Sequence, residues 1–163
     1  MKARRTLIPL LAIICAALLL PGFAESATKT PFVGIETFVA ELDPGSITFP
    51  AGKVHFRRAM NQLTDDTDND QVTGTSVIVG NGNLDGLFPP SGQLWGSWHT
   101  DVNAGGSWDG KWTGRLEMGV LSFRGTGHGS GDLEGLKIKI FGRSTSVPGI
   151  SEYWGWVIDP HGK

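Results

Sequence analysis

The residues of this chain that could do chemistry are charged side chains on otherwise apolar strand faces. Glu36 alternates with Phe32 and Phe38, and Arg58 follows Phe56 by two positions. Residues two apart on a strand share a face, so both charges would point into a core. A charge in a core is costly unless it is paired or hydrogen-bonded. We therefore expect Glu36 and Arg58 to have a specific role.

The two charges are predicted to meet because their strands, near 32–42 and 53–63, follow one another in the chain. Consecutive strands of a meander lie side by side. An ion pair of Glu36 and Arg58 would form a polar floor or a catalytic pair in a ligand cavity. Removing one partner alone would then cost about 3–5 kcal/mol. The alternative is that both side chains lie at strand ends and reach water, or form a purely structural pair.

Two further glutamates follow the same pattern. Glu134 alternates with Leu136 and Ile138, and Glu152 lies on the face of Trp154. Glu134 joins Glu36 and Arg58 among the candidate ligand-binding residues, with the same alternative of a strand end in water.

His99 and Asp101 lie two residues apart, on one face with Trp95 and Ser97. A carboxylate beside an imidazole could orient it as a base, or the two could bind a metal. No third ligand is evident in the sequence, so we expect no metal and no cofactor. His99 stays a candidate ligand-binding residue, with a plain surface pair as the alternative.

Six tryptophans are many for a chain of this size. They are Trp95, Trp98, Trp108, Trp112, Trp154 and Trp156. Buried tryptophans would fill the core or line an apolar pocket, whereas exposed ones would suit stacking on sugars. Trp95 and Trp98 fall on opposite faces, so at least one of them is a candidate for exposure. Trp95 and Trp112 are candidate ligand contacts.

The densest charge run, residues 65–70, resembles the start of a calcium loop, because Asp66, Asp68 and Asp70 alternate. The pattern then fails, since Gln71 stands where such a loop needs glycine and Val77 where it needs a bidentate glutamate. A solvated hairpin loop is the favoured interpretation, and a weak calcium site is the alternative.

Most of these candidate residues lie on predicted β-strands. Glycine is the commonest residue, at 24 of 163, and no window shows a clear 3.6-residue apolar period. Short alternating runs are separated by turn residues. The predicted strands are 32–42, 53–63, 72–81, 92–102, 107–117, 119–127, 133–142 and 151–159. We expect an all-β fold, a small antiparallel eight-stranded meander barrel, because closure removes exposed edges.

Parity along two runs predicts the inner face of this barrel. Trp108 and Trp112 share a face, while Asp109 and Lys111 share the other. In the run 133–142, Leu136, Ile138 and Ile140 point one way, while Lys137 and Lys139 point out. Charged outer faces of this kind argue against stable insertion into a membrane as a barrel.

The first 24 residues are predicted to be a cleaved signal peptide. Lys2, Arg4 and Arg5 precede an apolar run over 7–20, and Gly22-Phe23-Ala24 supplies a cleavage site. Residues 25–163 then form a single domain, and the protein is secreted or periplasmic. Cleavage removes the one cysteine and three of the 14 basic residues, but none of the 16 acidic ones. The remaining chain has no disulfide and is acidic, which argues against nucleic acid as a partner.

Two glycine-rich segments, the first of which also holds two tryptophans, carry a resemblance to a known family. They are Gly-Gly-Ser-Trp-Asp-Gly-Lys-Trp-Thr-Gly at 105–114, and Phe-Arg-Gly-Thr-Gly-His-Gly-Ser-Gly-Asp-Leu-Glu-Gly-Leu at 123–136. They resemble phrases of secreted bacterial proteins of the allene oxide cyclase barrel-like class, whose architecture dirigent proteins share. The resemblance implies an eight-stranded antiparallel barrel with an apolar cavity. No catalytic residue of that class matches a position here.

Together these observations predict a barrel that binds an apolar small molecule in its interior. A pure binder and a barrel that steers a cyclisation or an isomerisation by its shape both agree with the pattern. The alternative function is a carbohydrate- or surface-binding module that uses exposed tryptophans.

Overall fold

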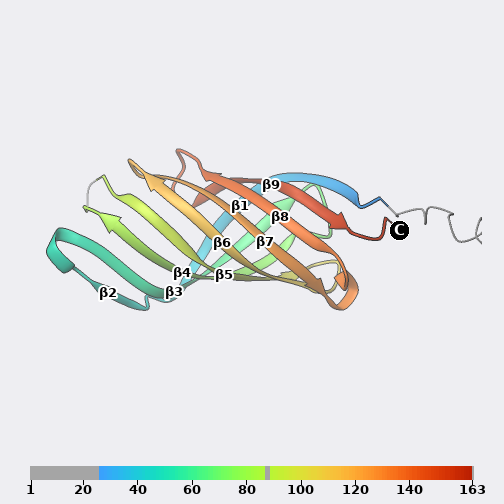
Figure 1. The fold of residues 1–163 in the computed structure, drawn as a ribbon, viewed down its shortest axis with the longest axis horizontal. Coiled ribbons are helices and arrows are strands. Elements are labelled where there is room, and N and C mark those ends of the chain that lie inside the picture. The colour runs from blue at the N-terminus through green and yellow to red at the C-terminus, as the bar shows by residue number, and fades with distance from the viewer. Residues whose placement is uncertain (1–25, 87–88, 163) are drawn as a thin grey trace, which may run out of the picture.

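The computed structural model describes residues 26–86 and 89–162, and the predicted signal peptide lies outside them. The described residues form nine β-strands and two short 3-10 helices (Figure 1). The strands are β1 (Thr28–Asp43), β2 (Ser46–Thr48), β3 (Lys53–Thr67), β4 (Gly74–Asp85), β5 (Ser91–Val102), β6 (Ser107–Glu117), β7 (Val120–Ser130), β8 (Lys137–Ser144) and β9 (Ile150–Asp159). The helices are η1 (Pro50–Gly52) and η2 (Gly131–Leu133).

The strands form a closed antiparallel barrel, which confirms the predicted fold class. From β3 to β9 each strand pairs with the next, and β1 closes the sheet by pairing with both β9 and β3. The barrel therefore has eight strands, and the short β2 pairs only with the start of β3. The start of β1 and the end of β9 lie at one end of the barrel, and β2 lies at the other (Figure 1).

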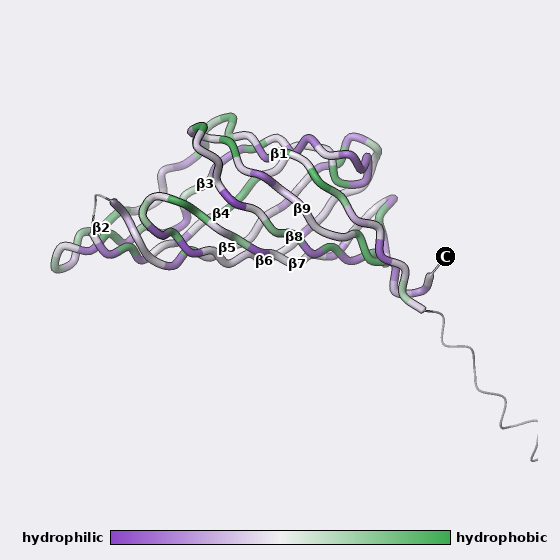
Figure 2. Tube along the Cα trace, turned by 90° about the horizontal axis from the view of Figure 1, so that it is seen from above, coloured by the Kyte–Doolittle hydropathy of each residue, from purple (hydrophilic) through white to green (hydrophobic). Residues whose placement is uncertain are grey.

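Buried and exposed residues alternate along most strands of the barrel, and hydrophobic and hydrophilic residues are interspersed along each strand (Figure 2). Trp108 and Trp112 are buried while Lys111 is exposed, and Ile138 and Ile140 are buried while Lys139 is exposed. The parity predictions for these two runs are confirmed. Other buried residues, from further strands, the β3–β4 turn and η2, complete the core, namely Phe32, Val72, Trp98, Val102, Leu133, Tyr153 and Val157.

Glycines on the inner face make room for the large rings of this narrow barrel. A Cβ at Gly110 would overlap the indole of Trp98, and a Cβ at Gly142 would overlap the ring of Phe123. The alternation of tryptophan and glycine on neighbouring strands thus fills the interior without crowding it.

The predicted strand boundaries differ from the structure at several strand ends, and β3, for example, extends to Thr67 instead of ending at 63. β2 was not predicted, because its three exposed residues carry no alternating pattern. Residues 133–136 belong to η2 and the turn after it, so β8 begins at Lys137. Asn81-Gly82-Asn83, which reads as a turn, lies inside β4.

A β-bulge in β3 overturns the predicted inward position of Arg58. Phe56 pairs with Gly82 and Ala59 pairs with Gly80, so two residues of β3 oppose Asn81 alone. Arg58 has a left-handed backbone, with φ of 59°, and its side chain is exposed. An extra residue in a strand inverts the faces that follow it. Beyond the bulge, odd-numbered residues such as Leu63 and Asp65 are the buried ones.

The predicted inner face of β9 is also wrong. Tyr153, Gly155 and Val157 are buried, whereas Trp154 and Trp156 are 37% and 38% exposed on the outer wall. The interior beside β9 is already filled, because the ring of Phe32 approaches the backbone of Gly155. Glu152, on the same face as the two tryptophans, is exposed as well.

Candidate functional site

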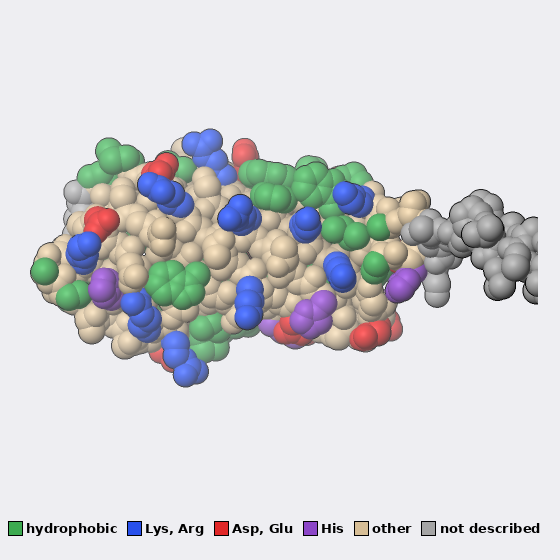
Figure 3. Space-filling view, viewed as in Figure 1, with side chains coloured by type: hydrophobic (Ala, Val, Ile, Leu, Met, Phe, Trp, Pro, Cys, Tyr) green, Lys and Arg blue, Asp and Glu red, His purple; other side chains and the backbone are tan. Residues whose placement is uncertain are grey.

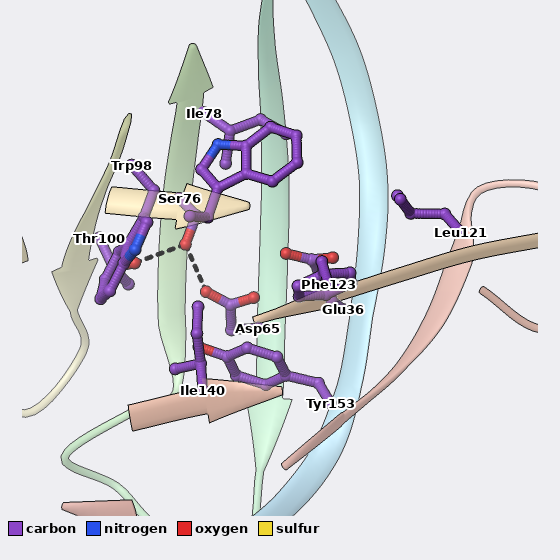
Figure 4. A pocket seen from close by; sticks show the side chains of 11 residues that line it. Glu36, Asp65, Ser76, Ile78, Trp98, Thr100, Leu121, Phe123, Ile140 and Tyr153 are labelled. Atoms are coloured by element: carbon purple, nitrogen blue, oxygen red, sulfur yellow. Dashed lines mark hydrogen bonds between the residues drawn. The ribbon is translucent and has the colours of Figure 1, made fainter. Parts of the chain in front are cut away.

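The interior of the barrel holds a cavity with a mostly apolar lining and a polar side (Figure 4). Its free volume is about 50 Å³, enough for a few water molecules at roughly 10–15 Å³ each. The lining residues come from all eight strands of the barrel. They are Glu36, Asp65, Ser76, Ile78, Trp98, Thr100, Trp112, Leu121, Phe123, Ile140 and Tyr153.

Asp65 is the centre of the polar side. The side chain is 3% exposed because the bulge in β3 turns it inward. Ser76 of β4 donates a short hydrogen bond to Asp65 Oδ2, and the hydroxyls of Ser76 and Thr100 lie 2.6 Å apart. Asp65 Oδ1 is buried and has no hydrogen-bond partner among the described residues. A buried acceptor without a partner is costly, so this atom is available to a bound molecule.

Glu36 brings a second carboxyl group to Asp65. The two residues are directly paired in the β1–β3 register, and both line the cavity (Figure 4). Burial, together with the nearby Asp65 carboxylate, raises the pKa of Glu36 to about 8. Burial raises the pKa of Asp65 to about 6, partly offset by the hydrogen bond from Ser76. At neutral pH Glu36 therefore keeps its proton while Asp65 is ionised.

Two kinds of polar group complete the site. The hydroxyl of Tyr153 is fully buried, and burial together with the two carboxyl groups raises its pKa. The indole nitrogens of Trp98 and Trp112 are buried donors that lack a partner within the described part of the chain. The described lining contains no lysine, arginine or histidine, so the carboxyl groups face the cavity without a cation.

This arrangement can hold a small molecule by both its apolar body and its polar groups. The aromatic and aliphatic side chains bury apolar surface. Asp65 Oδ1 can accept a hydrogen bond from such a molecule, and the two indole nitrogens can donate hydrogen bonds to it. A protonated Glu36 beside an ionised Asp65 also provides a proton donor and a proton acceptor in one cavity.

The predicted ion pair between Glu36 and Arg58 does not form. The two strands are neighbours, as expected, but the register places Glu36 beside Asp65. Arg58 lies on the outside at the bulge, where its backbone nitrogen donates to Asn81 Oδ1. The physical reason is the extra residue in β3, which reverses the parity on which the pairing was based.

The other predicted ligand-binding residues divide between the inside and the outside. Trp112 lines the cavity, as does Glu36. Glu134 follows η2 and is exposed, because the chain turns there rather than continuing as a strand. Trp95 is half-buried on the outer wall, with the guanidinium of Arg57 5.3 Å from its ring centre. Trp95 and Glu134 therefore do not reach the interior.

His99 lies on the outer wall between two carboxylates. Its Nδ1 is 2.9 Å from Asp109 Oδ1, directly across on β6, and its Nε2 is 3.2 Å from Asp101 Oδ1. Both ring nitrogens are thus engaged. The described residues contain no group of three or more histidine, aspartate or glutamate side chains suited to a metal ion. The hydrogen bond to Asp109 chiefly raises the pKa of His99, and Asp101 adds to this, whereas partial burial opposes it.

We expect the Asp109→Asn substitution to lower the pKa of His99, because it removes the carboxylate with the largest effect. An NMR titration of the His99 ring protons would measure it, with the wild-type midpoint above 6.5. Asp101→Asn should lower the midpoint by less. A midpoint that is the same in all three proteins would contradict the assignment of these contacts.

The acidic run 65–70 is only partly a loop. Asp65 and Asp66 belong to β3, and the turn begins at Asp68, whose carboxylate accepts a hydrogen bond from the backbone of Val33. Asp66 and Asp70 are exposed. The expectation of a solvated hairpin loop is therefore wrong for Asp65, which is the most buried charged residue in the described chain.

Sequence reasoning missed Asp65, Ser76, Thr100 and Tyr153. For two of them a signal was present. Thr100 lies between Trp98 and Val102 and shares their parity, and Ser76 shares the parity of Ile78. Small hydroxyl residues on an apolar face mark a polar patch in a core, as charged residues do.

Comparison of the chain with protein-family models, with curated proteins and with solved structures found no match in any of the three. In the part of the chain that the structure describes, no helix has the length and apolar character needed to span a membrane.

Proposed function

We propose that the barrel binds a small, mostly apolar molecule in its interior, and that a hydroxyl or amine of this molecule donates a hydrogen bond to Asp65. The observation that carries this proposal is the buried, unpartnered Oδ1 atom in a cavity with a largely aromatic and aliphatic lining. The resemblance to allene oxide cyclase-like barrels, which implies an apolar cavity, supports the same function. Export through the signal peptide would place this binding outside the cytoplasm.

The size of the cavity restricts the ligand. A volume of about 50 Å³ holds only a few non-hydrogen atoms. Leu121 and Phe123 are partly exposed at the start of β7, near the end of the barrel. We propose that a larger ligand enters by displacing these two side chains, and that its polar end then lies against Asp65.

The proposal extends to catalysis of an isomerisation or a cyclisation. Glu36 would give a proton to one atom of the ligand, and Asp65 would take a proton from another. The ligand keeps its number of protons. The proton gained by Asp65 then passes to Glu36, its cross-strand partner with the higher pKa, which restores both groups without a cofactor. The separation of the two carboxyl pKa values supports these roles, because it keeps one group protonated and the other ionised.

Native mass spectrometry of the protein purified from its own source tests the proposal. We expect an adduct whose mass identifies a small organic molecule. Asp65→Asn should weaken its retention by about tenfold or more, since a hydrogen bond to a charged group is worth about 1.5–3 kcal/mol. Asp66→Asn is the matched control, because Asp66 is the next residue of β3 and is exposed. Equal retention by both variants, or no adduct in the wild type, would overturn the proposal.

A second candidate function rests on the outer wall. Trp154 and Trp156 are exposed, and both lie against Phe141, with ring centres 6.3 and 5.7 Å apart. Exposed aromatic clusters suit stacking on sugars or contact with a surface. These exposed rings support the carbohydrate- or surface-binding alternative.

A further inference from the structure

The outer wall carries a row of five side chains that crosses the strands. Trp95 of β5, Thr113 of β6, Arg124 of β7, Phe141 of β8 and Trp154 of β9 are successive cross-strand partners. We call these five residues the outer row. Adjacent strands lie about 4.8 Å apart, so the row offers an aromatic, a hydroxyl, a cationic and two aromatic side chains at regular intervals.

A surface groove follows part of the outer row. Its polar and aromatic lining includes Gln93, Trp95, Thr113, Arg115, Arg124 and Phe141. Arg57 lies over the ring of Trp95 and fixes it, and Trp95 still borders the groove. Aromatic rings at the two sides of a groove with hydroxyl, amide and guanidinium groups between them match the alternating faces and hydroxyls of a sugar chain.

The charge of this wall is positive, in contrast to the acidic chain as a whole. Lys111, Arg124 and Lys139 are exposed and, over residues 26–86 and 89–162, have no acidic partner within ion-pair distance. Arg143 adds a further cation two residues from Phe141, opposite Glu152. Figure 3 shows basic side chains spread over this face and a hydrophobic cluster beside them.

We propose that the outer row binds an acidic oligosaccharide laid across strands β5 to β9, with sugar rings on Trp95, Phe141 and Trp154 and carboxylate groups on Arg124 and the flanking lysines. This inference rests on the second candidate function, carbohydrate binding, and is independent of the interior cavity. The sugar is expected to be acidic because Lys111, Arg124 and Lys139, the cations without an acidic partner among the described residues, lie near the aromatic rings.

Titration of the full chain with hexagalacturonate, and with maltohexaose as a neutral chain of the same length, tests the proposal. Tryptophan fluorescence is the readout, because two tryptophans lie in the outer row. We expect hexagalacturonate to bind about tenfold more tightly, through several exposed charge contacts, and to weaken as salt is raised. Trp154→Ala should reduce its affinity about tenfold or more, and Arg124→Gln about three- to fivefold.

Two exposed residues away from the outer row supply matched controls. Phe49→Ala removes an exposed aromatic ring beside η1, and Lys29→Gln removes an exposed cation at the start of β1. Both should keep the affinity within about twofold, because η1 and β1 lie outside the five strands of the outer row. A thermal melt of each variant establishes that it is folded.

Each other outcome has a definite meaning. If both sugars bind equally well and Trp154→Ala abolishes this binding, the outer row binds carbohydrate but the proposed preference for an acidic sugar is wrong. If neither sugar binds, both carbohydrate binding by the outer row and its preference for an acidic sugar are wrong. The proposal that the interior cavity binds a small molecule is unaffected. An equal loss in Lys29→Gln and Arg124→Gln shows an unspecific charge effect and overturns the site. If vesicles of anionic lipid compete with the sugar, and Trp154→Ala and Arg124→Gln weaken vesicle binding as well, the outer row is a lipid-binding surface. This result also overturns the carbohydrate site.

Discussion

Glu36→Gln is expected to raise the free energy of unfolding at pH 9 and to leave it nearly unchanged at pH 4. The pKa of Glu36 rises from 4.5 to about 8 in the folded barrel. As pH rises between these values, the unfolded chain loses this proton while the folded protein keeps it, so the wild type is progressively destabilised. A neutral glutamine removes this cost, which is a few kcal/mol at about 1.4 kcal/mol per pH unit.

Urea unfolding at several pH values measures this effect. Wild-type stability should also fall as Asp65 titrates, because burial raises its pKa to about 6 as well. Glu41→Gln is the matched control on the same strand, since Glu41 is exposed. The difference between Glu36→Gln and the wild type must grow from pH 4 to pH 9. A constant difference would show that the folded barrel does not hold this proton.

The sign of this expected result is opposite to the one that sequence reasoning predicts. An ion pair between Glu36 and Arg58 would make Glu36→Gln destabilising at neutral pH. In the structure the neighbour of Glu36 is another carboxyl group, so removing the charge relieves a penalty. The error has a single source, which is the bulge at Arg57 and Arg58. Arg58 adopts a left-handed backbone without being a glycine, so no local residue type signals it.

The fold was predictable because its signals repeat along the chain. Turn residues and glycines separate the alternating runs, and eight such runs of similar length suffice for a closed barrel. Inner faces were predictable where parity was unambiguous, as for Trp108 and Trp112, whose neighbours Asp109 and Lys111 are charged. In β9 both faces carry large apolar residues, and the register against Phe32 decides which face is buried. That contact joins residues distant in sequence, so composition alone does not reveal it.

The candidate site was predictable only through Glu36 and Trp112. Asp65 is drawn inward by a bulge that lies seven residues before it, and it belongs to a run of acidic residues that otherwise face water. Its inward position therefore depends on the bulge, which reverses the inner and outer faces of β3 beyond it. The candidate carbohydrate contacts of the outer row depend on register across five strands, which parity within one strand does not supply.

Trp108→Ala is expected to lower the free energy of unfolding by about 3–5 kcal/mol, as is usual when a fully buried tryptophan is truncated. Trp108 is 0% exposed, and its indole nitrogen donates a hydrogen bond of 2.7 Å to the carbonyl of Gln71. Gln71 lies in the turn between β3 and β4, beside the buried Val72. The substitution therefore leaves a cavity in the core and also frees the turn from its contact with β6.

Two further variants separate these contributions. Trp108→Phe keeps an aromatic ring but loses the indole donor, and it should cost less than the alanine variant, with about 1 kcal/mol from the lost hydrogen bond. Trp156→Ala, on the outer side of β9, should cost clearly less than Trp108→Ala, because Trp156 is 38% exposed. Urea unfolding with an unchanged slope would show that the folded barrel is the same in all three. If the two alanine variants proved equally stable, Trp108 could not be the core residue that joins β6 to the β3–β4 turn.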